Sequence, residues 1–343
     1  MSGPKVMLCP ASSGPYLENL ARELRAQGVR VTLIPWFGKQ MPYSMIRIIW
    51  SRLLGYRILH LNWMPFNNFW QLRLVTRVGK ILGIRVVWTI HNLAPHSVQF
   101  GSPERDEAAM QILFEWAERG VVHSERTREA VRMRYGNTLP LEVIPHGSYA
   151  GQVELVDSVE ARRRLGIPED KFAVLMLGPN RWNKGVRAYL EVISRLPDGY
   201  VGVVAGTCPD SQILNLIQEY KERFPDKFIL DVRRLSVGEV AEHYAASDIL
   251  LMPFEAITTS GTVIEALSYS RPVITTDKGD MYEWIHDGET GFMASSIDDM
   301  VSILKSLDRE KARRMGQNGL ALAKKRPWPE SARQYADIYR ELQ

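Results

Sequence analysis

Several features are scarce or missing in this chain of 343 residues. Its two cysteines, Cys9 and Cys208, lie far apart without metal-ligand spacing, which excludes a disulfide framework and indicates a reducing compartment. No apolar run approaches the length of about 18 residues that a membrane-spanning helix needs. The first residues hold one lysine and no long apolar segment, so no signal peptide is expected and the location is predicted to be cytoplasmic.

Acidic residues are absent from residues 24–103, and this absence is the second informative feature of the composition. That stretch holds ten Lys and Arg residues and five tryptophans. Residues 1–147 carry 18 basic and 10 acidic residues, a net charge of +8, which leaves −4 for the rest of a chain of net charge +4.

Basic residues interleaved with tryptophans are typical of proteins that bind an anionic membrane surface or a phospholipid-like ligand. Asn62, Trp63, Arg73 and Arg77 are therefore candidates for contacts with an acceptor or with the inner face of a membrane. The alternative is a solvated basic face with tryptophans in the core, as expected for Trp88. Nucleic acid is not expected, because the sequence has no helix-turn-helix, zinc-finger or RNA-binding signature.

Short apolar runs alternate with longer amphipathic segments, which predicts α/β structure with parallel sheets covered on both faces. The segments form two series of about 150 residues, so we expect two doubly wound, Rossmann-like domains whose sheets face an interdomain cleft. The predicted domains are residues 1–147, joined by a final helix at 328–343, and residues 148–327. No element is predicted between the boundary and residue 172, or between residues 276 and 296.

The most informative stretch is DILLMPFEAITTSGTVIEALSYSRPVITT at residues 248–276. It predicts a buried strand, a Ser/Thr/Gly loop and a helix with Glu265 in its first turn. Free N–H groups and the helix dipole make such a loop an anion site, formed here by Ser260, Gly261 and Thr262. Glu265 is placed to hold a ribose diol, so phosphate and ribose together indicate a nucleotide. An ordinary Ser-capped helix is the alternative.

The segment LMLGPNRWNKGV at residues 175–186 supplies cations at the tip of another strand. Gly178 makes the turn, and Arg181 and Lys184 suit a diphosphate group. Ligands of open parallel sheets bind beyond the carboxyl ends of the strands, so both loops are expected to face one pyrophosphate.

Strand ends in the first half carry the remaining candidates. Gly14 follows the first strand and allows close backbone approach, and Glu18 is either a dipole-compensating residue or a general base. His91 ends the strand at residues 86–90, where it can contact a sugar hydroxyl or accept a proton. A purely structural histidine is the alternative.

The layout resembles the GT-B glycosyltransferases, and in particular glycosyltransferase family 4 and its relatives. The Gly-Arg…Lys-Gly loop of that family is similar to Gly178…Lys184-Gly185 here, with Pro179 where the commonest arginine falls and Arg181 nearby. The segment IPHG at 144–147 resembles the family's hinge, and LSYSRPVIT resembles the stretch after its nucleotide site. The resemblance implies that His91 contacts the donor sugar and that Glu265 binds the ribose.

One position departs from the family pattern. The first Glu of the Glu-x7-Glu signature is replaced by Ile257, with Glu255 two residues away. This departure, together with the Thr-Ser-Gly variant, resembles the β-mannosyltransferases of xanthan-type polysaccharide assembly, which implies an inverting reaction on a polyprenyl-diphosphate-linked acceptor. Glu18, His91 and Glu255 are the candidate general bases.

The expected activity is transfer of a hexose from a GDP- or UDP-sugar, GDP-mannose among them, to a lipid-linked or oligosaccharide acceptor. No Asp-x-Asp pair occurs, so no metal and no cofactor is expected. A retaining family 4 enzyme, a nucleotide-sugar epimerase and a non-catalytic membrane partner with the same fold are the alternatives.

Overall fold

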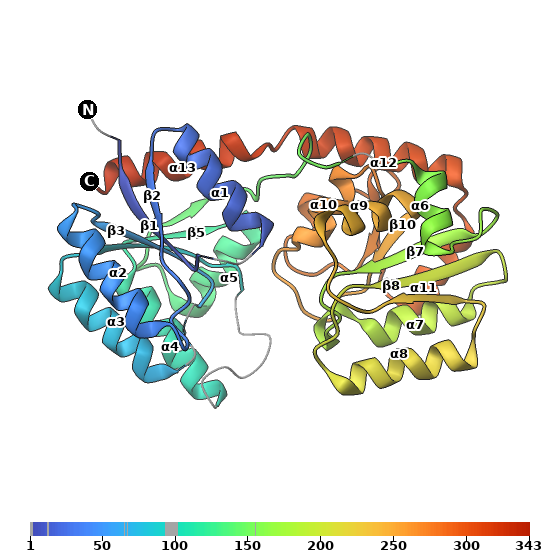
Figure 1. Cartoon of the computed structure of the whole chain (residues 1–343), viewed down its shortest axis with the longest axis horizontal. Coiled ribbons are helices and arrows are strands. Elements are labelled where there is room, and N and C mark those ends of the chain that lie inside the picture. Colours follow the sequence, from blue (N-terminus) through green and yellow to red (C-terminus); the bar gives the residue numbers. More distant parts are fainter. Residues whose placement is uncertain (1–2, 12–13, 65, 67, 93–101, 155) are drawn as a thin grey trace. The chain divides into compact units, whose positions relative to one another are not determined.

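The computed structural model describes residues 3–11, 14–64, 66, 68–92, 102–154 and 156–343 (Figure 1). The chain divides into two compact units, which we describe separately. Unit 1 comprises residues Met1–Gly147 and Trp328–Gln343, and unit 2 comprises residues Ser148–Pro327. His96 and the other residues of 93–101, part of the loop that follows His91, lie outside the described residues.

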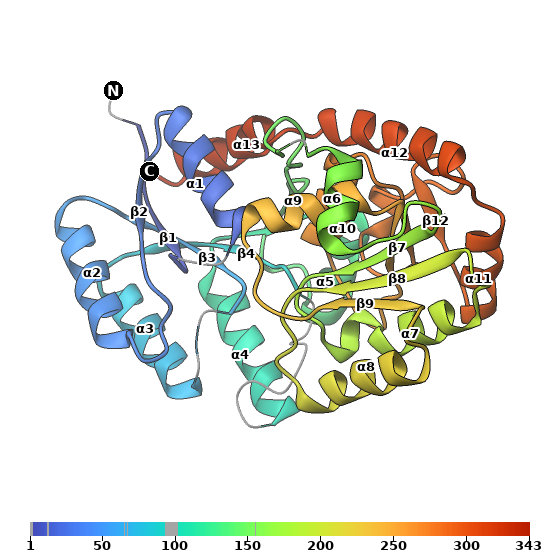
Figure 2. The ribbon, with the colours of Figure 1, turned by 45° about the vertical axis from the view of Figure 1, so that its right-hand side comes forward.

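Unit 1 is built on a parallel sheet of six strands in the order β2-β1-β3-β4-β5-β6. The strands are β1 (Lys5–Cys9), β2 (Arg30–Leu33), β3 (Ile58–Asn62), β4 (Arg85–Thr89), β5 (Arg119–Val122) and β6 (Leu141–Val143). The helices are α1 (Pro15–Ala26), α2 (Met41–Leu53), α3 (Phe69–Ile81), α4 (Pro103–Trp116), α5 (Glu125–Tyr135) and α13 (Trp328–Glu341). In both views α13 runs beside α1, although more than 300 residues separate them in the sequence (Figure 2).

Alternate residues of each strand face opposite sides of this sheet. Met7, Leu59 and Trp88 belong to the apolar cluster shared with α2, α3 and α4. His60 and Thr89 point the other way, where His60 meets the α13 hydroxyl of Tyr339. Trp88 is therefore a core residue, as predicted from its place in an apolar strand.

Unit 2 contains a second parallel sheet, in the order β12-β11-β10-β7-β8-β9. Its strands are β7 (Phe172–Leu177), β8 (Tyr200–Ala205), β9 (Phe228–Asp231), β10 (Ile249–Met252), β11 (Val273–Thr275) and β12 (Gly291–Met293). Its helices are α6 (Ser158–Leu165), α7 (Val186–Arg195), α8 (Ser211–Arg223), α9 (Val237–Ala246), α10 (Gly261–Ser268), α11 (Ile297–Lys305) and α12 (Arg309–Lys324), with short 3-10 turns at Trp182–Lys184 and Met281–Glu283.

The strand order of unit 2 is that of a Rossmann sheet, because the chain moves outward from β7 to β9 and then returns to the other side with β10. The switch point lies between β7 and β10, and ligands bind such sheets at the carboxyl ends of those strands. The predicted α/β class with two Rossmann-like sheets is confirmed. Helix α6 and strand β12 were not predicted, because one is a short Arg-rich helix and the other has three residues and begins with glycine.

Candidate functional site

Two loops meet at the switch point of unit 2, one after β7 and one after β10. The backbone N–H of Glu255 donates to the carbonyl oxygen of Asn183 at 3.0 Å, and Asn183 Nδ2 donates to the carbonyl oxygen of Ala256 at 3.2 Å. These contacts tie the loops together. That the two loops act on one ligand stays a prediction.

Lys184 is the cation that both loops surround. Its Nζ donates to Thr262 Oγ1 at 3.5 Å, at the start of α10. Gly178 has φ of +107°, and a Cβ there would lie 2.8 Å from Lys184 Nζ, so this position needs a glycine both for its backbone and for the lysine. Gly178, Lys184 and Thr262 thus converge, while Arg181 is exposed and near enough to disfavour the charge on Lys184.

The N-terminus of α10 offers backbone donors beside this lysine. Ser260 caps the helix by accepting from the Val263 N–H at 3.3 Å, so its hydroxyl serves the helix itself. The N–H groups of Gly261 and Thr262 have no hydrogen-bond partner in the described part of the chain. A helix start with free N–H groups next to a lysine is suited to a phosphate group.

Glu265 lies beside these groups, but as the fifth residue of α10 and not in its first turn, which corrects the sequence prediction. Its Oε2 lies 3.1 Å from the hydroxyl of Tyr244. Burial raises the pKa of Glu265 to about 7, opposed by the Tyr244 hydrogen bond and the charge of Lys184. Burial, followed by the charge of Arg181, lowers the pKa of Lys184 to about 8. In both residues the effect of burial on the pKa outweighs the effect of the opposite charge. A bound anion beside Lys184 would therefore favour its protonated form.

Unit 1 gathers a second group of side chains at the carboxyl end of its sheet. His91 is 7% exposed, stacks on Trp63 with ring centroids 4.1 Å apart, and meets the edge of Tyr16 at 4.7 Å. Trp63 is half-buried in a left-handed conformation with φ of +56°, and its carbonyl oxygen accepts from Trp88 Nε1 at 2.9 Å. Such a strained residue, held by a buried donor, is typical of functional sites.

The surroundings of His91 limit its chemistry. Its Nε2 lies 3.3 Å from Asn62 Oδ1, and Asn62 is fully buried, so Asn62 supports His91 and does not reach a membrane or acceptor. Burial, followed by the charge of His123, holds the pKa of His91 well below its usual range. A neutral imidazole at neutral pH is a hydrogen-bonding group and a weak base, so this environment favours contact with a hydroxyl over proton abstraction.

Sequence reasoning missed two neighbours of His91. His123 follows β5 and His146 follows β6, and both are buried. Their rings lie 5.1 Å and 5.5 Å apart along the series His91, His123, His146. The signal that could have found them is their position, since each lies within three residues after the end of a strand, as His91 does.

The other predicted residues of this set are exposed. Gly14 caps α1 with φ of +79°, and Glu18 in its first turn is exposed. Glu255 is exposed in the loop after β10. Arg73, which lies over the Phe69 ring at 4.9 Å, and Arg77 are exposed on α3. No group of three potential metal ligands lies close together among the described residues.

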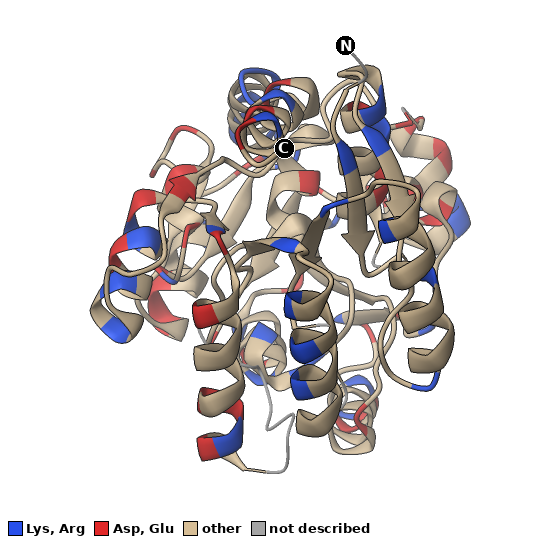
Figure 3. Cartoon of the chain, turned by 90° about the vertical axis from the view of Figure 1, so that its left-hand side faces the viewer, with Lys and Arg blue, Asp and Glu red and all other residues tan. Residues whose placement is uncertain are grey.

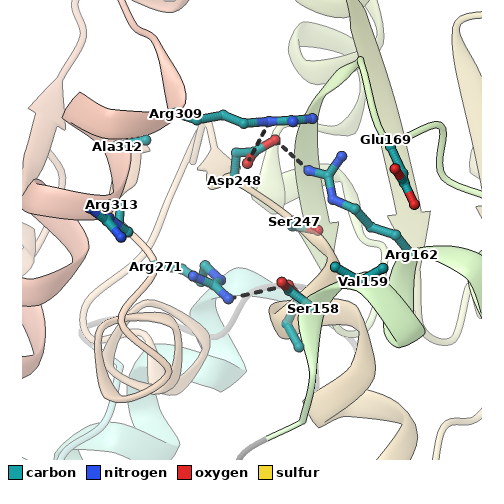
Figure 4. Close-up of a pocket in the computed structure, with 11 residues that line it drawn as sticks. Ser158, Val159, Arg162, Glu169, Ser247, Asp248, Arg271, Arg309, Ala312 and Arg313 are labelled. Carbon is teal, nitrogen blue, oxygen red and sulfur yellow. Dashed lines mark hydrogen bonds and ion pairs between the residues drawn. The ribbon is translucent and has the colours of Figure 1, made fainter.

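An arginine-lined pocket of about 340 Å³ lies at the opposite, amino-terminal edge of the unit 2 sheet (Figure 4). Asp248 is its hub: it lies 2.6 Å from Arg162 of α6 and 3.4 Å from Arg309 of α12. Arg271 donates to the carbonyl oxygen of Tyr244 at the end of α9. These contacts hold α6, α9 and α12 against the sheet of unit 2. The role of these contacts is therefore structural.

The fold and this site define a class of protein. Two Rossmann-like units, with a lysine, a helix N-terminus and a carboxylate at the switch point of the second, are the features of a GT-B glycosyltransferase. The family model described as Glycosyltransferase Family 4 matches residues 13–148, and the model described as Glycosyl transferases group 1 matches residues 171–308. The chain belongs to the family 4-related GT-B glycosyltransferases, and it is an enzyme of the hexosyltransferase class.

Individual relatives agree with this assignment. D-inositol 3-phosphate glycosyltransferase of Corynebacterium kroppenstedtii is 24% identical over 98% of this chain and 76% of its own length. The lipopolysaccharide core biosynthesis mannosyltransferase LpsB of Rhizobium meliloti is 29% identical over 63% of this chain and 67% of its own.

Solved structures share the fold. Sucrose-phosphate synthase from Thermosynechococcus elongatus superposes with a TM-score of 0.81 at 19% identity, covering 99% of both chains. Anabaena HepE in complex with UDP-glucose gives 0.78 at 14% identity, covering 98% of this chain and 99% of that one.

Proposed function

We propose that this enzyme transfers a hexose from a GDP- or UDP-sugar to a lipid-linked or oligosaccharide acceptor in cell-surface polysaccharide assembly, without a metal ion. The observation that carries the donor assignment is the convergence of Lys184, Thr262 and Glu265 at the switch point of unit 2. LpsB, a lipopolysaccharide core mannosyltransferase, and HepE, solved with UDP-glucose, support a sugar-nucleotide donor and a surface polysaccharide product.

In this proposal Lys184 and the N–H groups at the start of α10 stabilise the diphosphate leaving group. They accelerate the transfer because the negative charge of the diphosphate grows in the transition state. Glu265 accepts from the ribose hydroxyls. His91 of unit 1 contacts a hydroxyl of the donor sugar, and Trp63 offers an aromatic surface to the acceptor.

Calorimetric titration with UDP and GDP tests the donor site. Lys184→Ala should weaken binding of the preferred nucleotide by about tenfold or more, since a charge-assisted hydrogen bond is lost. Lys305→Ala is the matched control, because Lys305 is an exposed lysine of unit 2 on α11. Absence of binding by the wild-type protein to both nucleotides, or equal affinities in both variants, would remove the donor assignment.

The membrane part of the proposal rests on one surface of unit 1. Ten of the thirteen exposed large hydrophobic side chains among the described residues lie between residues 36 and 81. The helices α2 and α3 carry basic residues and no acidic ones (Figure 3). We define the α2–α3 surface by its exposed apolar residues Tyr43, Ile46, Ile49, Trp50, Leu53, Leu54, Trp70, Leu74 and Ile81.

The α2–α3 surface has the chemistry of an interfacial anchor, because apolar side chains enter the lipid boundary while Lys and Arg bind anionic headgroups. Trp50 and Trp70 are 64% and 58% exposed, so both are available to the headgroup region. We therefore propose that the enzyme binds peripherally to an anionic bilayer, where its acceptor would be presented. No helix in the described part of the chain is long and apolar enough to cross a membrane.

Sedimentation with vesicles of phosphatidylglycerol and phosphatidylcholine tests the anchor. The double variant Trp50→Glu and Trp70→Glu should partition more than about tenfold less onto vesicles rich in phosphatidylglycerol. Val237→Glu replaces a hydrophobic residue 77% exposed on unit 2 and should leave binding unchanged. Wild-type protein that stays in the supernatant at low salt would contradict the anchor.

Inversion is the proposed stereochemistry, supported by Ile257 at the position of the family's sugar-binding Glu. Retention is the second candidate, favoured by the name of the Streptomyces kanamyceticus relative, alpha-D-kanosaminyltransferase, 25% identical over 77% of this chain. NMR of the anomeric proton of the product, compared with the donor, separates the two.

A further inference from the structure

The arginine-lined pocket of unit 2 carries more positive than negative charge (Figure 4). All of its lining residues belong to unit 2. Its charged lining residues are four arginines and two carboxylates, namely Arg162, Arg271, Arg309, Arg313, Asp248 and Glu169. The lining therefore has an excess of two positive charges. Fixed cations gathered around a concave surface raise the local concentration of anions.

Asp248 is already fully engaged by the protein. Its Oδ2 accepts from Arg162 Nη2 at 2.6 Å and from the backbone N–H of Ala173 at 2.7 Å, and its Oδ1 lies 3.4 Å from Arg309 Nε. Arg162 also donates to two backbone carbonyl oxygens through Nη1. Arg162 and Asp248 thus satisfy each other, and the excess charge lies on the remaining arginines.

Arg271 is a partly buried cation that lacks a carboxylate partner. Its Nε donates to the carbonyl oxygen of Tyr244 at 2.6 Å and its Nη2 to that of Ala245 at 3.2 Å, while Nη1 makes only a long contact of 3.5 Å to the carbonyl oxygen of Ser270. Burial lowers the pKa of Arg271, and the charge of Asp248 opposes this only in part. An anion in the pocket would supply the missing counter-charge.

Arg309 and Arg313 lie four residues apart on α12 and therefore on one face of that helix. Like charges at this spacing disfavour a helix unless another charge compensates them. Asp248 compensates Arg309 in part, whereas Arg313 makes no hydrogen bond or ion pair with any residue that the structure describes. Arg313 therefore offers a complete guanidinium group to a ligand of the pocket.

We infer that this pocket binds a small anion that carries a phosphate group, through Arg271, Arg309 and Arg313. Arginine suits such a ligand because two of its N–H groups can bind two phosphate oxygens side by side. The volume of about 340 Å³ lies within the usual range of ligand pockets and equals the share of roughly ten water molecules in the liquid. A single phosphate fills only part of it, so pyrophosphate or a small phosphate ester is the class that fits.

This site is separate from the donor loops. Asp248 and Arg271 lie just before β10 and β11, whereas the loop to Thr262 follows β10 and Lys184 follows β7. Parallel strands place these two sets of residues at opposite edges of the sheet. A phosphate compound bound in the pocket is therefore an additional ligand of unit 2 and not the sugar donor.

Arginine labelling with phenylglyoxal, followed by tandem mass spectrometry of the full-length wild-type protein, tests the pocket. Inorganic pyrophosphate and glycerol 3-phosphate are the probes, each compared with potassium chloride at the same ionic strength. At about ten times its Kd a probe should slow the labelling of Arg313 about tenfold, because only the unoccupied fraction reacts. Arg314 is the internal control, since it is exposed on the same helix, does not line the pocket and should be labelled at an unchanged rate.

Two matched variants give a second readout by calorimetric titration with the probe that protects better. Arg313→Gln should weaken binding about tenfold or more, because charge-assisted hydrogen bonds are lost, and Arg314→Gln should bind as the wild type does. Both variants keep Lys184, so binding at the donor loops is common to them. Protection by pyrophosphate alone would assign a diphosphate ligand, and protection by glycerol 3-phosphate would assign an ester.

The inference is overturned if neither probe protects Arg313, if Arg313 and Arg314 are protected equally, or if the two variants bind with equal affinity. None of these outcomes depends on UDP, GDP or Lys184. The result therefore stands apart from the test of the donor site, and either can fail while the other holds.

Discussion

At the scale of single residues, Lys184 combines a cationic function with a site that disfavours its charge. Burial lowers its pKa to about 8. A bound diphosphate favours the protonated form of Lys184, so the pKa of Lys184 rises on binding. The affinity for the nucleotide is therefore greatest below pH 8, where Lys184 is already protonated in the free enzyme. Above pH 8 the free enzyme must take up a proton to bind, and the Kd for UDP or GDP should rise about tenfold per pH unit.

Titration calorimetry between pH 7 and 9 in buffers of different ionisation heat measures both the affinity and the proton uptake. Lys184→Arg is the matched variant, because a guanidinium stays protonated over this range and should remove the alkaline loss of affinity. The same pH dependence in Lys184→Arg would show that another group titrates.

Residue-level prediction from sequence reached only as far as the chemistry is local, and its donor-site assignment stays a prediction. The loop carrying Gly178 and Lys184 and the loop leading to Glu265 are each contiguous, and parallel strands bring their ends to one edge. The pairing of His91 with His123 was missed because 32 residues separate them and only the adjacency of β4 and β5 brings them together. Asn62 was assigned to an acceptor surface because burial at the end of a strand cannot be read from one residue type.

At the scale of elements, α13 is attached to the unit 1 sheet by a buried polar network. Tyr339 lies 2.6 Å from His60 Nδ1, and His60 Nε2 lies 2.7 Å from the Thr89 hydroxyl. Tyr335 joins the Thr89 hydroxyl at 3.1 Å and the Tyr16 hydroxyl at 3.0 Å. A fully paired buried network of this kind specifies one docking position for a helix, because any shift leaves polar groups without partners.

Tyr339→Phe tests this attachment. The substitution leaves a buried ring nitrogen of His60 without a partner, so the free energy of unfolding should fall by about 1–3 kcal/mol. Tyr220→Phe on α8 is the control, since the Tyr220 hydroxyl makes no hydrogen bond among the described residues, and it should change stability by less than about 0.5 kcal/mol. Urea unfolding followed by tryptophan fluorescence measures both, and equal effects would mean that the network does not hold α13.

Elements were predictable from sequence in proportion to their apolar periodicity. The amphipathic final helix was predicted from the spacing of its apolar residues. Its packing on the first unit was also predicted, but the polar residues that hold it there were not. Helix α6 was not found because its buried side is formed partly by Arg162, whose charge is matched by Asp248, the residue before β10. A charged residue on the inward side of a helix does not register as part of an apolar stripe.

At the scale of the whole molecule, buried histidines should make the stability of the two units respond differently to acid. Burial lowers the pKa of His60 and His146 to about 3 and holds that of His91 well below its usual range, and all three lie in unit 1. Unit 2 contains the opposite case, because burial raises the pKa of Glu265 to about 7.

The signs follow from proton counts. Between about pH 3 and pH 6.5 the unfolded form of unit 1 binds protons that the folded form does not, so its stability is complete above pH 6.5 and is lost as the pH falls. Each histidine contributes up to about 1.4 kcal/mol per pH unit. For Glu265 the folded state binds the extra proton. The stability of unit 2 therefore rises as the pH falls from 7 to about 4.3, the pKa of this carboxyl group in the unfolded chain.

Urea unfolding at pH 7.0, 6.0 and 5.0 checks this difference, because most of the nine tryptophans lie in unit 1 and report on it. The midpoint of that transition should fall steadily from pH 6.5 to pH 5, a range in which ordinary carboxylates remain ionised in both states. His146→Gln removes one of the three protons taken up on unfolding and should reduce the slope by about a third, whereas His286→Gln, which replaces a histidine 47% exposed on unit 2, should leave it unchanged. A midpoint independent of pH would mean that these histidines become protonated without unfolding.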